Sequence, residues 1–179
     1  MKETDKIIIP LSKTKITLLT FGAIAFVVVG FLFTINPEKY VTQIFRSKEL
    51  IRIAGIASIG FFGLCGIYWI FKLFDTKPGL IIDQNGVLDN SSGISAGLIN
   101  WNDVQHIDKL EIARQRFIMI IVSNPEDYIE RQNNGFKRRV MKLNLKKYET
   151  PLQISTNGLK IEFDKLYNAL INSWKKYAN

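Results

Sequence analysis

Two long apolar runs in the first half of the sequence constrain its fold more than any other feature. Residues 16–35 (ITLLTFGAIAFVVVGFLFTI) and 53–71 (IAGIASIGFFGLCGIYWIF) contain no charged side chain. A helix rises about 1.5 Å per residue, so each run spans roughly 30 Å, the thickness of a bilayer's hydrocarbon core. Helices buried in a soluble core, the alternative, usually keep a polar stripe, and these runs show none. The sequence therefore predicts two transmembrane helices, at about residues 16–35 and 53–73.

A cleaved signal peptide is the other alternative for the first run. Its apolar stretch is normally about 7–15 residues long and ends at a small-residue cleavage site. The first run is longer and continues into residues 34–37 (TINP), where no such site occurs. We therefore expect the first helix to be retained. The single cysteine, Cys65, lies inside the second apolar run, where a packing role is expected.

The cations that flank the two runs predict their orientation. The outer flanks carry six cations and the connecting loop carries four: Lys2, Lys6, Lys13, Lys15, Lys72 and Lys77 against Lys39, Arg46, Lys48 and Arg52. The positive-inside rule then places both termini in the cytoplasm, with the chain crossing the inner (plasma) membrane twice. In the loop, Tyr40, Val41, Ile44 and Phe45 recur at helical spacing, which favours an amphipathic turn lying on the membrane. The predicted organisation is a cytoplasmic segment 1–15, a transmembrane hairpin 16–74 and a soluble domain 75–179.

The soluble domain has the pattern of an α+β fold. Short strands are predicted at residues 80–83, 87–89, 117–122 and 152–154, with one long, bent strand at 97–112. Asn85-Gly86 predicts a tight turn between the first two strands. Trp101, within the long strand and among apolar neighbours, is expected in the core rather than at an exposed binding surface.

Three helices are expected in the same domain. Asn124-Pro125 predicts the start of a short helix. Residues 136–148 alternate as in a strand but also fit a helix, which we favour; Phe136, Val140 and Leu143 would share one face of it. The last helix is strongly amphipathic, with apolar residues at Phe163, Leu166, Tyr167, Leu170, Ile171 and Trp174.

Several strands closed by an amphipathic helix outline a pleckstrin-homology-like (PH-like) barrel. Residues 97–104 (GLINWNDV), after an Asn-Gly turn and two membrane helices, resemble bacterial two-pass membrane proteins with a C-terminal PH-like domain. Residues 124–129 (NPEDYI), 141–144 (MKLN) and 150–154 (TPLQI) are similar to one uncharacterised family of these. That family often has a glycine where this chain has Glu149. The resemblance implies two transmembrane helices followed by a small antiparallel β-barrel with a helical insertion and a C-terminal helix, and it brings no catalytic residues.

Composition weighs against several function classes. The chain has one histidine and one cysteine, so no Cys-rich zinc site or His-based metal site is expected, and we expect no metal and no cofactor. No Gly-rich phosphate loop occurs. Residues 75–179 hold 15 Lys and Arg against 12 Asp and Glu, a net charge of +3, which is too small for a nucleic-acid interface. His106, Asp103, Asp108 and Glu111 are interpreted as ordinary surface residues.

The best candidate site is a row of basic residues in the segment 137–147. If this segment is a helix, Arg138, Lys142 and Lys146 follow one another at every fourth position, with Arg139 beside them. Each cation near an anionic bilayer contributes about 1 kcal/mol. A solvated face that only keeps the domain soluble remains the alternative, and the residue pattern favours it slightly.

The leading hypothesis is a non-enzymatic, membrane-anchored binding module that engages a protein partner, another copy of itself or anionic lipid headgroups. The alternative is a regulatory or immunity-type protein that acts on another membrane component through its transmembrane helices. An enzyme acting on lipid headgroups is least favoured, because no nucleophile–base pair is recognisable.

Overall fold

The computed structural model describes residues 6–42 and 47–178, which divide into two compact units. Residues 13–76 form a helical hairpin. Residues 6–12 and 77–178 together form an α+β domain, so the hairpin is inserted into the domain near its N-terminal end. Two of the loop residues expected to form an amphipathic turn, Ile44 and Phe45, lie outside the described residues.

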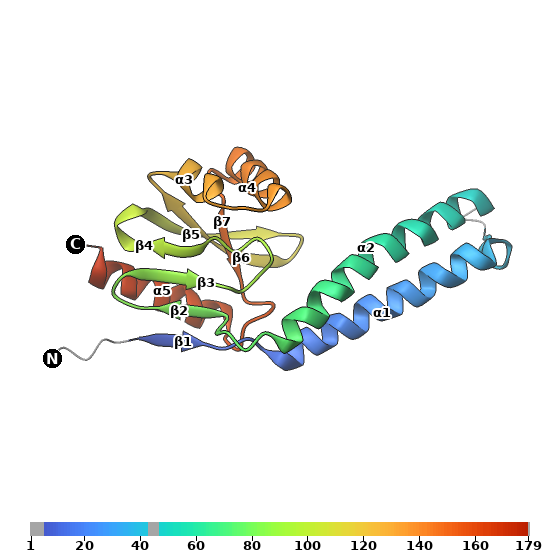
Figure 1. Cartoon of the computed structure of the whole chain (residues 1–179), viewed down its shortest axis with the longest axis horizontal. Coiled ribbons are helices and arrows are strands. Elements are labelled where there is room, and N and C mark those ends of the chain that lie inside the picture. The colour runs from blue at the N-terminus through green and yellow to red at the C-terminus, as the bar shows by residue number, and fades with distance from the viewer. Residues whose placement is uncertain (1–5, 43–46, 179) are drawn as a thin grey trace. The chain divides into compact units, whose positions relative to one another are not determined.

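The hairpin consists of α1 (Lys13–Ile35), the 3-10 turn η1 (Pro37–Tyr40) and α2 (Lys48–Phe74). The two helices lie side by side (Figure 1) and each is long and apolar enough to cross a membrane. Large side chains such as Phe21 and Leu64 are exposed, unlike those of a soluble core. Helix α2 begins five residues before the predicted start because Ser47 caps it, its hydroxyl accepting the Leu50 N–H at 3.3 Å.

The backbones of the two helices come close together where Gly30 faces Gly55. A Cβ atom on Gly55 would lie 2.6 Å from the carbonyl oxygen of Gly30 and 2.6 Å from Oγ1 of Thr34. Beside this contact, the Ser58 hydroxyl donates to the carbonyl oxygen of Phe26 at 2.9 Å. Small residues permit close backbone approach between helices in an apolar solvent, where packing and hydrogen bonds drive association.

Replacing Gly55 with Val is expected to loosen the hairpin. The added side chain overlaps backbone of α1, and overpacking of this kind costs about 1–3 kcal/mol. The matched control is Gly60→Val, because a Cβ at Gly60 meets nothing within 4 Å. Thermal unfolding in detergent micelles should show a lower midpoint for Gly55→Val than for Gly60→Val. Equal midpoints would contradict the observed helix contact.

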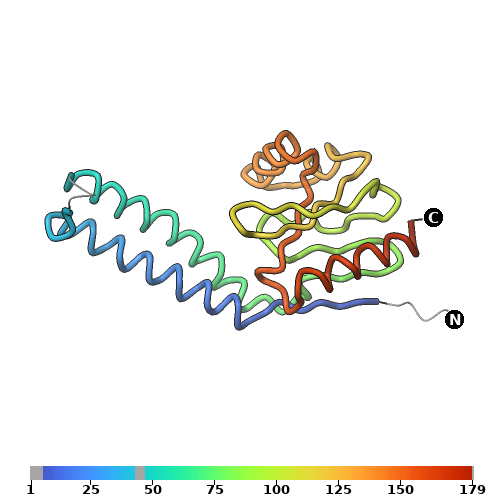
Figure 2. Tube along the Cα trace, turned by 180° about the vertical axis from the view of Figure 1, so that it is seen from behind, coloured from blue at the N-terminus to red at the C-terminus, as the bar shows by residue number. Residues whose placement is uncertain are grey.

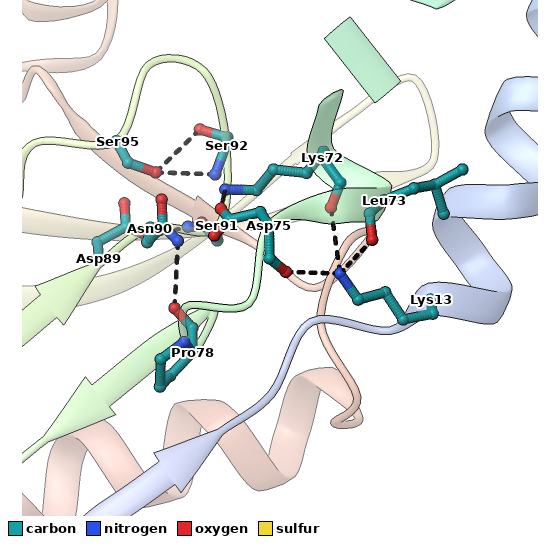
Figure 3. A network of polar contacts seen from close by, with 10 residues as sticks. All are labelled: Lys13, Lys72, Leu73, Asp75, Pro78, Asp89, Asn90, Ser91, Ser92 and Ser95. Atoms are coloured by element: carbon teal, nitrogen blue, oxygen red, sulfur yellow. Dashed lines mark hydrogen bonds and ion pairs between the residues drawn. The ribbon is translucent and has the colours of Figure 1, made fainter. Parts of the chain in front are cut away.

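A lysine side chain links the two helices at the end of the hairpin where α1 begins and α2 ends. Nζ of Lys13, the first residue of α1, donates to the carbonyl oxygens of Lys72, Leu73 and Asp75 at 3.3, 2.7 and 2.6 Å (Figure 3). The last carbonyls of a helix have no partner within it and attract cations. Lys13 therefore stabilises the C-terminal end of α2 and holds the two helices together there.

The α+β domain contains two antiparallel sheets. The first has the strand order β1-β2-β3-β4 and the second β5-β6-β7. Helices α3 and α4 lie between β6 and β7 in the chain, and α5 ends the domain. The bounds are β1 (Ile7–Ile9), β2 (Leu80–Ile82), β3 (Gly86–Asp89), β4 (Gly97–Asn100), η2 (Trp101–Asp103), β5 (Val104–Ile112), β6 (Gln115–Val122), α3 (Pro125–Glu130), α4 (Gly135–Tyr148), β7 (Leu152–Ser155) and α5 (Phe163–Tyr177).

The described residues form these two sheets rather than the closed barrel that the sequence predicts, and the predicted strand at 97–112 is two strands in different sheets. The 3-10 turn η2 ends β4 and redirects the chain into β5. Polar side chains occupy the outer edge of β4. The Tyr128 hydroxyl accepts the Asn100 N–H at 3.2 Å, and Arg131 donates to the carbonyl oxygens of Ala96, at 2.9 Å, and of Leu98. Backbone groups at a sheet edge that are hydrogen-bonded in this way cannot pair with another strand.

The N-terminal segment contributes an edge strand that the sequence does not predict. In β1, Ile7 lies opposite Ile82 and Ile9 opposite Leu80. The next residues pair with a loop before α5: the Ser12 N–H donates to the carbonyl oxygen of Gly158 at 2.8 Å. Figure 2 shows β1 running beside α5. Cleavage after the first apolar run would remove a strand of this sheet, which supports a retained first helix.

Both sheets and α5 contribute to one hydrophobic core in the domain. Trp101 is 2% exposed, and its Nε1 donates to the carbonyl oxygen of Asp83 at 2.8 Å, so the prediction that it lies in the core is confirmed. The amphipathic pattern of α5 is confirmed as well. Fully or almost fully buried apolar residues include Leu80, Ile82, Val87, Ile99, Ile107, Ile118, Ile120, Ile154, Phe163, Leu166 and Leu170.

Candidate functional site

The basic segment 137–147 is helical, as favoured from the sequence, and belongs to α4. At its start the Asn134 side chain accepts the Lys137 N–H at 3.1 Å. Met141 is fully buried and fixes the inner face of the helix. The helix ends at Glu149, whose φ of 61° is left-handed and whose N–H donates to the carbonyl oxygen of Leu145 at 3.0 Å. This conformation favours glycine, the residue often found at this position in the family that the sequence resembles.

The structure brings the four predicted site residues together on the outer side of α4. We call Arg138, Arg139, Lys142 and Lys146 the α4 basic face. With Gly135 and Leu143 they line a shallow, open groove of about 460 Å³. All four side chains are exposed. The structure thus places all four residues on one surface, while their role stays a prediction.

The charge of this face is not neutralised nearby. Helix α4 contains six Lys and Arg residues and no Asp or Glu. Within residues 6–42 and 47–178, none of the four side chains of the α4 basic face forms an ion pair or a side-chain hydrogen bond. Elsewhere Lys109 and Arg116 pair with Asp164 at 3.2 and 3.0 Å. The α4 basic face is thus a cluster of four cations without ion-pair partners among the described residues.

The shared apolar face of α4 is largely exposed. Phe136 and Leu143, which share this face with Val140, are 71% and 60% exposed. The buried side of the helix is the one that carries Met141. The 100° spacing therefore groups these residues on one face, and the structure places Phe136 and Leu143 of that face in solvent beside the α4 basic face.

Beneath the start of α4, a buried carboxylate lies at the end of β3. Asp89 accepts the Ser91 N–H at 2.8 Å, and the hydroxyls of Ser92 and Ser95 lie close by in the same loop (Figure 3). Burial raises the pKa of Asp89 above its ordinary value, against the opposing effect of these hydrogen bonds and of the Lys137 charge. Burial lowers the pKa of Lys137, which Asp89 partly offsets. Asp89 and Lys137 thus each favour the charged form of the other, but burial has the larger effect on both.

Replacing Asp89 with Asn should change how stability depends on pH. A raised pKa means that the folded domain holds the proton more tightly than the unfolded chain, so this contribution to stability is complete below about pH 3.9 and is lost as pH rises through the folded pKa. Asn keeps the acceptor for the Ser91 N–H. The variant should therefore gain stability relative to wild type between acid and neutral pH.

The control for this prediction is Asp164→Asn. Hydrogen bonds from Arg116 and Lys109 lower the pKa of Asp164, so stability from this exposed group is lost as pH falls. Relative to wild type, Asp164→Asn should lose stability as the pH rises toward neutral. This pH dependence is opposite in sign to the one expected for Asp89→Asn. Unfolding midpoints measured across the acidic range check both. If the unfolding midpoints of wild type and Asp89→Asn change in parallel with pH, the raised pKa of Asp89 is contradicted.

The other polar residues considered from the sequence form contacts that stabilise the fold or lie on the surface. The Tyr128 hydroxyl donates to Oδ2 of Asp103 at 2.6 Å, and burial, followed by this hydrogen bond, raises the pKa of Tyr128 to about 12. This contact joins residues that are 25 positions apart in the chain, so no local sequence pattern could predict it. Exposed His106 lies 3.8 Å from Asp108. No group of three or more His, Cys, Asp or Glu among the described residues has the arrangement of a metal site.

Comparisons of the chain with family models, curated proteins and solved structures found no match. The similarity to two-pass membrane proteins with a PH-like domain stays a prediction from the sequence.

Proposed function

We propose that this protein is a non-enzymatic, membrane-anchored binding module that engages an anionic ligand through the α4 basic face. One observation carries the proposal: four exposed cations on one helix line a single groove, with no acidic residue in that helix. A face that served only for solubility would not need its cations on one side of a helix. Charge gathered in this way raises the local concentration of anionic ligands.

We further propose that the domain is PH-like. The features that support this are a four-stranded and a three-stranded antiparallel sheet followed by an amphipathic C-terminal helix. The proposed location is the inner (plasma) membrane with both termini in the cytoplasm. The pairing of β1 with β2 supports an even number of membrane crossings, because it holds both ends of the hairpin in one domain. The six-to-four distribution of flanking cations supports the cytoplasmic side.

Binding of an acidic peptide tests the proposal. The full chain is placed in nanodiscs of phosphatidylcholine alone, and a fluorescent peptide rich in glutamate is titrated at low salt. The variant Arg138→Glu/Lys142→Glu/Lys146→Glu should bind at least about tenfold more weakly, since each surface charge pair contributes up to about 1 kcal/mol. Added salt should weaken binding to wild type.

The matched control changes the net charge by the same amount, but through substitutions elsewhere on the domain. Arg114→Glu/Lys160→Glu/Lys175→Glu alters three exposed cations outside α4. This variant should bind the peptide much more tightly than the α4 variant. If wild type binds no peptide at low salt, or if both triple variants lose binding equally, the α4 basic face is not the binding site.

A further inference from the structure

Two exposed apolar side chains extend the α4 basic face. Phe136 and Leu143 are seven residues apart, so they lie within about 20° of each other around the helix. Arg139 and Lys147 lie on either side of them. Exposed large apolar residues within a cationic helix face are the pattern of a helix that lies in a membrane interface.

We propose that α4 is an interfacial helix that binds the anionic surface of the membrane in which the chain is anchored, with Phe136 and Leu143 entering the boundary between headgroups and acyl chains. This inference rests on the proposed function and specifies its ligand. The cations of the α4 basic face would contact lipid phosphates while their aliphatic stems lie along the apolar layer. Met141 and the inner side of α4 remain packed on the domain.

The chain itself favours a bilayer over an acidic protein as the ligand. Three residues separate β1 from α1, and five separate α2 from β2. Five residues extend at most about 18 Å, so a domain anchored by the hairpin stays near the bilayer surface. The effective concentration of the bilayer is therefore high, and modest attraction suffices to orient the domain. An acidic protein explains the cations but leaves the exposed Phe136 and Leu143 without a role.

A fluorescent reporter on α4 tests the inference in the full chain. Cys65 is replaced by Ser, and Lys147, which is exposed on the same side as Phe136, is replaced by Cys and labelled with the polarity-sensitive dye NBD. Nanodiscs of phosphatidylcholine are compared with an equimolar mixture of phosphatidylcholine and phosphatidylglycerol. In the anionic discs the NBD emission should move to shorter wavelength, and nitroxide-labelled lipids should quench it.

Three variants separate the contribution of charge from that of insertion. Phe136→Ser/Leu143→Ser should lose the wavelength shift while keeping its affinity for the acidic peptide. Leu88→Ser/Leu98→Ser, which removes two exposed leucines from the first sheet, should keep both. Arg138→Glu/Lys142→Glu/Lys146→Glu should lose both.

Three outcomes overturn the inference in different ways. If the emission is the same in both discs while wild type still binds the acidic peptide, α4 does not enter the membrane, and the ligand of the α4 basic face is an acidic protein. If the emission does not change and the peptide does not bind, the proposed function fails as well. A shift that persists in Phe136→Ser/Leu143→Ser also overturns insertion by these two residues.

Discussion

Replacing Ile9 with Asp is expected to abolish the native structure of the α+β domain. Ile9 is 3% exposed and lies opposite Leu80 in the first sheet. Loss of a buried isoleucine removes about 2–3 kcal/mol of apolar burial, and burial of an unpaired carboxylate adds several kcal/mol. The sum approaches the entire stability of a typical domain, about 5–15 kcal/mol. Hydrogen exchange of the β2 and β3 amides should show loss of protection.

Ile8→Asp is the matched control. Ile8 is the adjacent residue in the same strand and is 54% exposed, so the same substitution places its charge in solvent. This variant should keep the protection of β2. Equal loss in both variants would mean that the added negative charge itself, rather than the lost buried contact, causes the effect.

The same contact predicts the behaviour of a fragment that contains only residues 77–179. This fragment lacks β1 and leaves the outer edge of β2 unpaired, with Leu80 and Ile82 partly uncovered. We expect it to aggregate or unfold. A soluble form of the domain needs residues 6–12 joined to residue 77 by a flexible linker in place of the hairpin, and this form should remain monomeric in gel filtration. Aggregation of both forms would contradict the importance of β1.

Elements determined by local periodicity could be predicted from the sequence. The apolar runs identify α1 and α2, and the 3.6-residue repeat identifies α5, because these patterns depend only on neighbouring residues. The predicted start of α2 is five residues too late, because Lys48 and Arg52 are charged and the uncharged run begins only after them. A charge at the end of a membrane helix is compatible with the helix, since it can reach the headgroup layer.

Contacts between distant segments could not be predicted in this way. The three residues of β1 are too few for a periodic pattern, and their partner strand follows more than 60 residues later. Beside the break at η2, Tyr128 and Arg131 contact the edge of β4 from another part of the chain, and no local pattern indicates these contacts. In the candidate site, helical spacing brought the four cations together correctly. It did not reveal which side of α4 is buried, because that depends on packing around Met141.

Replacing Trp101 with Ala should be the most damaging change in the core of the domain. Trp101 stands in η2, where the chain passes from the first sheet to the second, and it is 2% exposed. Truncation of a buried Trp typically costs about 3–5 kcal/mol. The carbonyl oxygen of Asp83 also loses the donor at 2.8 Å, which adds about 1–3 kcal/mol if it stays buried. Exchange of the β6 amides should become much faster.

Two Trp→Phe substitutions compare a buried ring that donates a hydrogen bond with a half-buried ring that does not. Trp101→Phe removes both ring volume and the donor to Asp83, whereas the Nε1 of half-buried Trp174 has no acceptor among the described residues. The Trp101 ring is also the more deeply buried of the two. Trp101→Phe should therefore destabilise the domain more than Trp174→Phe, by at least about the 1–3 kcal/mol of an unpaired carbonyl. Equal unfolding midpoints for the two variants would contradict a stabilising role for the bond to Asp83.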